Sequence, residues 1–155
     1  MAISEKVKKF LDDNKVKHEV RAHDKAFTAQ GLARTDHVSG KNVAKVVLLK
    51  TRQGYAMAVL QAHKMLDMSA AKHATGEKGL GLAEESDFQS LFPDCEVGAM
   101  SPFGNLYGIP VYVDEGLAQD DEVEFNAGTH TEAVRMKYAD FARLAKPKVA
   151  RLTAE

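Results

Sequence analysis

The 155-residue sequence has one cysteine, no long hydrophobic run and almost no net charge, and each absence excludes a class of protein. Because Cys95 is the only cysteine, an intrachain disulfide framework is excluded and a reducing compartment is the simpler expectation. No apolar run approaches the roughly 20 residues that cross a bilayer, and the opening MAISEKVKKF lacks the hydrophobic core of a signal peptide. We therefore expect a soluble cytoplasmic protein.

The charge balance limits the kinds of partner. Lys and Arg total 21 and Asp and Glu total 22, which gives a formal net charge of -1. An extensive basic surface for binding nucleic acid is therefore excluded, and any contact with phosphates must come from a small group of basic residues. The length fits one domain with a continuous core, which we expect to span residues 1–155.

The hydrophobic patterns predict alternating short helices and strands. Apolar residues at helical spacing predict a helix from Ile3, a short one after Thr28, and others at 66–75, 84–93 and 139–146. Strands are predicted at 16–23, 44–51, 55–60, 110–114, 122–126 and 131–138, with 122–126 exposing one polar face. We expect loops at 76–84 and 96–108 and fraying from Lys146 onward. The fold class is therefore α/β or α+β with a mixed sheet.

Lys45 is the most informative single residue. Its predicted strand is apolar on both faces, and an ammonium there is costly unless it reaches solvent or an anion. Two interpretations follow: the side chain extends to water at the rim of the sheet, or it binds an anionic ligand.

A loop and a turn provide the other candidates. Gly98-Ala99-Met100-Ser101-Pro102 has the composition of an ordinary turn, yet glycine also lets backbone amides approach a carbonyl or a developing oxyanion. His130 lies two residues after Gly128 in a polar turn, where it could be a catalytic base, a metal ligand, a pocket wall or a histidine bonded to its own loop.

Metal and nucleophile signatures are missing from the sequence. His18 and His23 are five apart, hence on opposite faces of a strand, and His63 and His73 lack an HExxH pattern. Ser101 lies in no GxSxG elbow, and the glycines of GEKGLG have the wrong spacing for a nucleotide loop. We expect no metal and no cofactor.

Taken in order, several segments resemble the YbaK and prolyl-tRNA synthetase editing-domain family, which includes free-standing aminoacyl-tRNA deacylases. The matching segments cover nearly the whole chain: HDKAFTAQGLA (23–33), AKVVLLK (44–50), GAMSPFG (98–104), IPVYVD (109–114) and FNAGTHTEAVRMKYADFARL (125–144). The resemblance implies one aminoacyl-tRNA editing domain with a strongly curved, barrel-like mixed sheet flanked by helices.

The resemblance also implies a reaction and a set of site residues. The reaction is hydrolysis, in trans and without metal or nucleotide, of the ester that links a wrong, small amino acid to tRNA. Lys45 would hold the terminal adenosine and its phosphate, and Gly98, Ala99, Met100, Ser101 and Pro102 would frame the aminoacyl carbonyl. The expected substrate-binding residues are Ala26, Phe27, Thr28, Asn126, Gly128 and His130, with Met100 as a further pocket wall.

The expected partners are the acceptor end of aminoacyl-tRNA and a synthetase that delivers it. The expected phosphate contacts come from Lys41, Lys50 and Arg52, in addition to Lys45. Two other functions stay open at this point. One is a non-catalytic module that binds a tRNA end or a protein, and the other is hydrolysis of an unrelated small ester.

Overall fold

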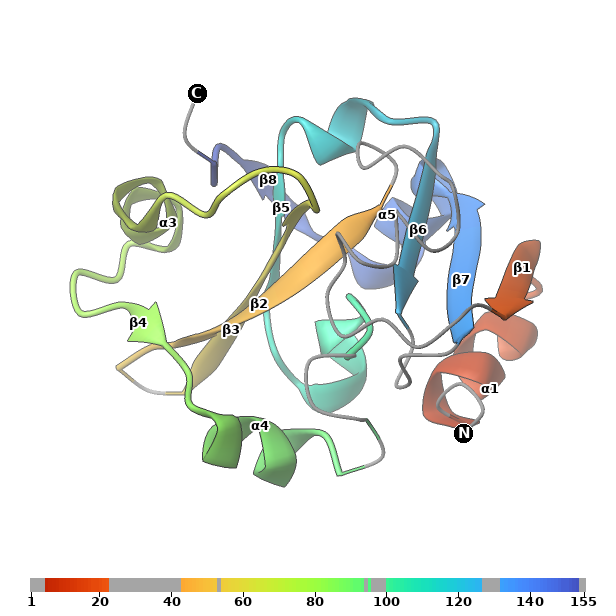
Figure 1. Ribbon diagram of the computed structural model, residues 1–155, viewed down its shortest axis with the longest axis horizontal. Helices are drawn as coiled ribbons and strands as arrows, with labels where there is room; N and C mark the ends of the chain where they lie inside the picture. Colours follow the sequence, from red (N-terminus) through yellow and green to blue (C-terminus); the bar gives the residue numbers. More distant parts are fainter. Residues whose placement is uncertain are drawn as a thin grey trace.

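The computed structural model describes residues 5–22, 43–52, 54–93, 95, 100–126 and 132–153. Within them, helices and strands alternate along the chain (Figure 1). The helices are α1 (Glu5–Asp13), α3 (Met68–Thr75), α4 (Glu85–Leu91), α5 (Tyr138–Ala145) and the 3-10 turns η1 (Gly104–Tyr107) and η2 (Leu117–Gln119). The strands are β1 (His18–Ala22), β2 (Ala44–Lys50), β3 (Tyr55–Gln61), β4 (Gly81–Leu82), β5 (Val111–Asp114), β6 (Glu122–Asn126), β7 (Glu132–Lys137) and β8 (Lys148–Ala150).

The described strands form two sheets. One has the order β1-β7-β6 and the other β4-β2-β3-β5-β8. The larger sheet is mixed, because β3 pairs with β5 and β5 with β8 in parallel while β2 pairs antiparallel with β3. An isolated parallel bridge between Val43 and Glu124 brings the two sheets together. The mixed α/β fold is thus confirmed; within the described segments the sheets do not close, so a barrel stays a prediction.

The β2–β3 hairpin forms the centre of the fold, as its apolar sequence predicts. Its register runs from Ala44 opposite Gln61 to Lys50 opposite Tyr55. Side chains alternate between faces, so Ala44 and Leu48 join the main hydrophobic cluster while Leu49 joins a second cluster beneath α3. The prediction that this strand is buried on both faces is therefore confirmed.

The prediction of a polar, solvent-facing side on 122–126 is wrong. Glu122 is exposed, but Glu124 is 0% exposed and Asn126 only 7%. Glu124 lies opposite Arg135 on β7, and its Oε1 is 3.8 Å from the Arg135 Nη1. The bridge from Val43 covers the same strand, so a cross-strand cation and the second sheet replace water around this carboxylate.

The expected fraying after Lys146 is also wrong for the described residues. Strand β8 pairs with β5, and Thr153 forms an antiparallel bridge with Leu66. The buried Asp114 fixes this segment, since its Oδ1 accepts from the Leu152 amide at 2.8 Å and from the Thr153 hydroxyl at 3.3 Å. The loop predicted at 96–108 contains η1, and the loop at 76–84 contains the two-residue strand β4.

Candidate active site

Lys45 lies near the start of β2, opposite Leu60 on β3. It is on the same side of the strand as Val47 and Leu49, as alternation predicts, and its side chain is partly buried. This burial lowers the pKa of Lys45 below its ordinary value of 10.5 because desolvation disfavours the charged ammonium. An anion placed beside this group would offset the desolvation.

The bridge between the sheets brings a second polar residue close to Lys45. Val43 and Glu124 pair in parallel, so two steps further along each chain Lys45 and Asn126 project from neighbouring segments to the same side. Asn126 ends β6, and its buried Oδ1 accepts no hydrogen bond from any residue that the structure describes. A partly desolvated ammonium and an amide oxygen that has no hydrogen-bond donor among the described residues thus share one side of this junction, which suits a polar ligand.

The described part of the Gly98–Pro102 loop is buried. Met100 is 7% and Ser101 1% exposed, and Pro102 is also buried. The Ser101 Oγ accepts a long hydrogen bond of 3.5 Å from the Phe103 amide, which holds the turn that leads into η1. Met100 packs in the main hydrophobic cluster beside residues of β2.

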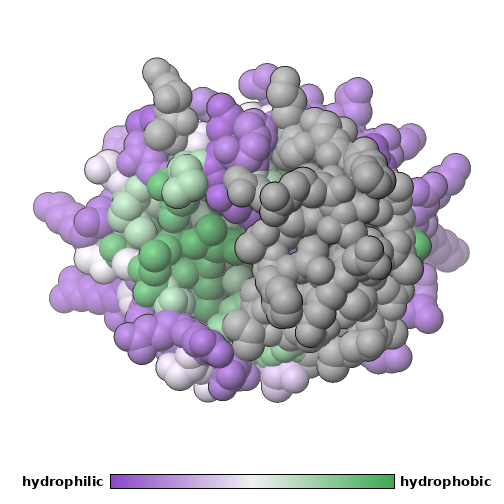
Figure 2. Space-filling model, in the orientation of Figure 1, coloured by the Kyte–Doolittle hydropathy of each residue, from purple (hydrophilic) through white to green (hydrophobic). Residues whose placement is uncertain are grey.

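Met100 also lines an apolar pocket of ≈ 270 Å³ at the edge of β2. Three successive residues of β2 face this pocket, which places it at the strand's edge because successive side chains otherwise point to opposite faces. The full lining is Val46, Val47, Leu48, Leu82, Ala83, Glu84, Glu85, Phe88 and Met100. Figure 2 shows a hydrophobic area over β2, β3 and β4 with hydrophilic side chains around it.

The edge of β2 offers backbone groups to this pocket. The Val43 carbonyl accepts from Ala62 on the β3 side, whereas the Leu48 carbonyl accepts from the Ala83 amide on the other side. Along β2, the backbone groups of successive residues point alternately toward β3 and away from it. Val46 is an even number of residues from Leu48, so its amide and carbonyl also point away from β3, toward the pocket. Strand β4 pairs only with Leu49 and Lys50, so among the described strands none covers Val46.

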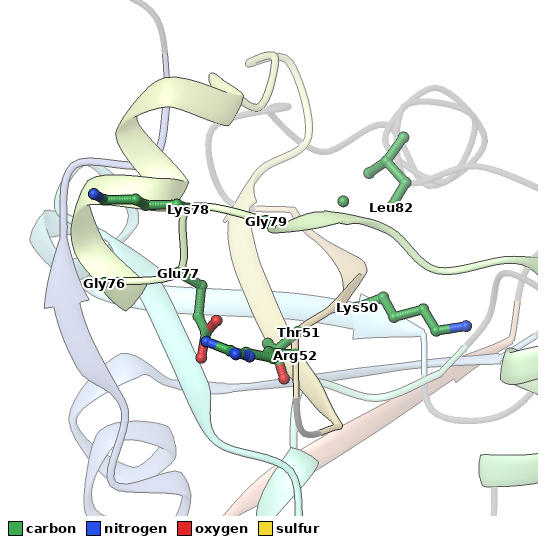
Figure 3. A pocket seen from close by; sticks show the side chains of 9 residues that line it. Lys50, Thr51, Arg52, Gly76, Glu77, Lys78, Gly79 and Leu82 are labelled. Carbon is green, nitrogen blue, oxygen red and sulfur yellow. The ribbon is translucent and has the colours of Figure 1, made fainter.

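Lys50 and Arg52 lie at a different hollow, at the far end of the hairpin. This pocket of ≈ 690 Å³ is lined by Lys50, Thr51, Arg52, Gly76, Glu77, Lys78, Gly79, Gly81 and Leu82 (Figure 3). The Lys50 Nζ is 3.8 Å from an Asp87 carboxylate oxygen.

Asp87 belongs to a small polar network beside this hollow. It accepts a 2.6 Å hydrogen bond from the Tyr55 hydroxyl, which lowers the pKa of Asp87 and raises that of Tyr55. Lys50 is thus anchored to α4 through the same carboxylate.

The structure brings together only some of the predicted site residues. Lys45 and Asn126 share one side of the sheet junction, Met100 lies at the β2 edge, and Lys50 and Arg52 lie at the hairpin tip. Eight predicted residues lie outside the described residues: Ala26, Phe27, Thr28, Lys41, Gly98, Ala99, Gly128 and His130.

Sequence reasoning did not single out Val46, Leu82, Phe88 or Lys78. The sequence predicts the strand of Val46 and the helix of Phe88, but the hollows that these residues line form only when β4 pairs with β2 and α4 packs beside it. The local sequence holds no signal for either contact. Among the described residues, no group of three or more His, Cys, Asp or Glu side chains could hold a metal ion. The described helices include none long and apolar enough to cross a membrane.

Comparison of the sequence and the fold with known proteins assigns the chain to a family. The chain is 30% identical over 96 residues to the multifunctional Ser/Thr-tRNA deacylase ProXp-y of Escherichia coli K12, a match that covers 61% of this chain. The match covers 57% of the E. coli protein, so it spans little more than half of that relative.

Solved structures share the fold. A protein described as a candidate trans-editing enzyme for prolyl-tRNA synthetase superposes with a TM-score of 0.84 at 21% identity, covering 97% of this chain and 96% of that one. A hypothetical protein, APE2540, superposes with a TM-score of 0.87 at 18% identity, covering 97% of this chain and 100% of that one. Residues 23–144 match the family described as the aminoacyl-tRNA editing domain, and the chain therefore belongs to that family, as its resemblance to editing domains predicted.

Proposed function

We propose that the protein is a trans-editing hydrolase that removes a small, wrongly attached amino acid from aminoacyl-tRNA. The observation that supports this proposal is a partly buried Lys45 close to the junction of the two sheets, next in sequence to Val46, which lines an apolar pocket together with Met100. Membership of the editing-domain family supports the reaction class. The E. coli relative makes seryl- and threonyl-tRNA the first substrates to test.

The reaction needs orientation more than a reactive side chain. Water attacks the ester carbonyl carbon, the bond from that carbon to the ribose oxygen breaks, and the ribose oxygen takes up the proton. The products are a free amino acid and a tRNA with a free terminal hydroxyl. The neighbouring ribose hydroxyl can orient the water and relay its proton, so no metal or protein nucleophile is required, and orientation alone removes several kcal/mol of barrier.

Each proposed group has one task. The Lys45 ammonium holds the terminal adenosine's phosphate, whose charge offsets the desolvation of that side chain. Backbone amides of the Gly98–Pro102 loop stabilise the developing oxyanion, at about 3 kcal/mol for each donor. The buried Oδ1 of Asn126, which has no donor among the described residues, accepts a hydrogen bond from the substrate. We assign the donor as the α-ammonium group of the amino acid.

The apolar pocket provides the selectivity. One methylene in such a pocket changes binding by only about 1–3 kcal/mol, so accurate charging needs a second pocket that selects by size. Met100 supplies one described wall, and we assign further walls to Ala26, Phe27 and His130 on the basis of the family resemblance. Serine, threonine, alanine and cysteine are the side chains to compare.

A panel of mischarged tRNAs tests the proposal. The purified protein should release free amino acid from at least one tRNA that carries a small wrong residue, and leave the correctly charged tRNA intact. Replacing the terminal 2′-hydroxyl by hydrogen should abolish release if the substrate assists its own cleavage. Binding without release from any member of the panel would instead identify a non-catalytic module, and release unaffected by the 2′-deoxy substitution would remove substrate assistance.

A further inference from the structure

The cationic hollow at the hairpin tip and the apolar pocket at the β2 edge are neighbours. Leu82 of β4 lines both, and its side chain is 62% exposed, although leucine is among the residues most often buried. The two hollows therefore meet across β4. A ligand long enough to occupy both would pass over Leu82.

The charge of the first hollow suits an extended anion better than a single phosphate. Three cationic side chains and one carboxylate line it, namely Lys50, Arg52, Lys78 and Glu77. Lys50 and Lys78 extend in opposite directions (Figure 3), so their ammonium groups lie apart and do not converge on one point. A row of separated cations matches the repeating charge of a nucleic-acid backbone.

Two of these cations are available for a ligand. Arg52 and Lys78 are exposed, and neither has an ion-pair partner in the part of the chain that the structure describes. The main chain is also approachable, because open space surrounds Gly79 and Gly81 where a side chain would begin. A polymer backbone can therefore lie close to the loop between α3 and β4.

We propose that the hollow between the hairpin tip and the α3–β4 loop binds the phosphate backbone of the tRNA acceptor end, whose single-stranded 3′ terminus then crosses Leu82 toward the Met100 pocket. The proposal rests on the proposed function for its choice of nucleic acid. Leu82 supplies an exposed apolar surface for van der Waals contact with the face of a base, and such a contact tolerates different sequences because it involves none of the hydrogen-bonding groups that distinguish one base from another. This surface is separate from the Lys45 site and determines the direction from which the substrate enters.

Binding of uncharged tRNA tests the cationic part without requiring catalysis. The double variant Arg52→Glu, Lys78→Glu should weaken tRNA affinity by roughly tenfold or more at low salt, because two phosphate contacts become repulsive. The matched control Lys8→Glu, Lys148→Glu has the same change in net charge on α1 and on β8, the strand at the opposite edge of the sheet from β4. The charge-conserving Arg52→Lys, Lys78→Arg variant should bind like the wild type and shows whether charge, rather than folding, is responsible.

Leu82→Ala tests the path across β4. It should weaken binding of intact tRNA several-fold, as expected for the loss of one base contact, and leave unchanged the binding of tRNA whose single-stranded 3′ end has been removed. Equal binding by the charge-reversed double variant and its control would overturn the cationic surface, and equal effects of Leu82→Ala on both tRNAs would overturn the path. Deacylation is measured separately, so a wild-type protein that binds tRNA but releases no amino acid refutes the proposed function alone.

Discussion

At the scale of single residues, Lys45 shows how a group with a proposed function can be unfavourable for stability. Its partial burial lowers its pKa below the ordinary value of 10.5. At pH values between the folded-state pKa and 10.5, the unfolded chain therefore binds more protons than the folded chain. Stability therefore rises with pH through that window, and below the window the folded state carries the full cost of a desolvated ammonium. An apolar residue of similar length removes that cost.

We therefore predict that Lys45→Met loses activity without losing stability. Single-turnover deacylation should fall on the order of a hundredfold, because an electrostatic contact to the substrate disappears. The unfolding midpoint at neutral pH should equal or exceed that of the wild type, measured by thermal denaturation with circular dichroism. Wild-type single-turnover rates in Lys45→Met or Lys45→Ala would exclude the lysine from the mechanism.

His130 lies outside the described residues, so its role rests on the sequence and the family resemblance. If it is a wall of the amino acid pocket, then His130→Ala enlarges the pocket and admits larger side chains. We predict a wider range of amino acids released from mischarged tRNAs, with a smaller effect on the rate for the best substrate. Loss of rate by the same factor for every amino acid would indicate a catalytic histidine instead.

At the scale of elements, sequence patterns predicted those features that depend on neighbouring residues. The hairpin from Ala44 to Gln61 follows from apolar runs separated by a polar turn. The helix predicted at 66–75 is α3, which the structure begins at Met68, where Asp67 caps the amides of Ser69 and Ala70. The burial of Glu124 did not follow, because it depends on a bridge to Val43, 81 positions earlier in the sequence. The same limit applies to the pocket, which forms only when β4 and α4 pack beside β2.

Asp114, which ends β5 and accepts hydrogen bonds from Leu152 and Thr153, leads to a prediction about stability. Asp114→Ala should lower the free energy of unfolding by about 3 kcal/mol, because the buried Leu152 amide loses its charged acceptor. Asp114→Asn keeps one side-chain oxygen as an acceptor and should cost less. Urea denaturation measures both, with the exposed Asp121→Ala as the control. A loss no larger than that of the control would show that β8 is held by its strand pairing with β5 alone.

At the scale of the whole molecule, the formal net charge of -1 limits how many tRNA phosphates the protein could neutralise under the proposed function. If two to four phosphates are neutralised, the logarithm of the affinity should fall with the logarithm of salt concentration with a slope of about -2 to -3. Raising salt from about 50 to 200 mM would then weaken binding roughly 16-fold to 64-fold. Fluorescence anisotropy of labelled tRNA across a salt series measures this slope.

A shallow slope has a consequence for how the protein would meet the proposed tRNA substrate. A protein that neutralises few phosphates binds most tRNAs weakly, so under the proposed function selection would depend on the terminal amino acid and on any synthetase that transfers the tRNA. We predict that the slope becomes shallower by about 1 to 2 in the Arg52→Glu, Lys78→Glu variant and is unchanged in the Lys8→Glu, Lys148→Glu control. A wild-type affinity that drops by several decades over the same salt range would require a far larger basic surface than the described residues provide, and would place most of the tRNA contacts elsewhere in the chain.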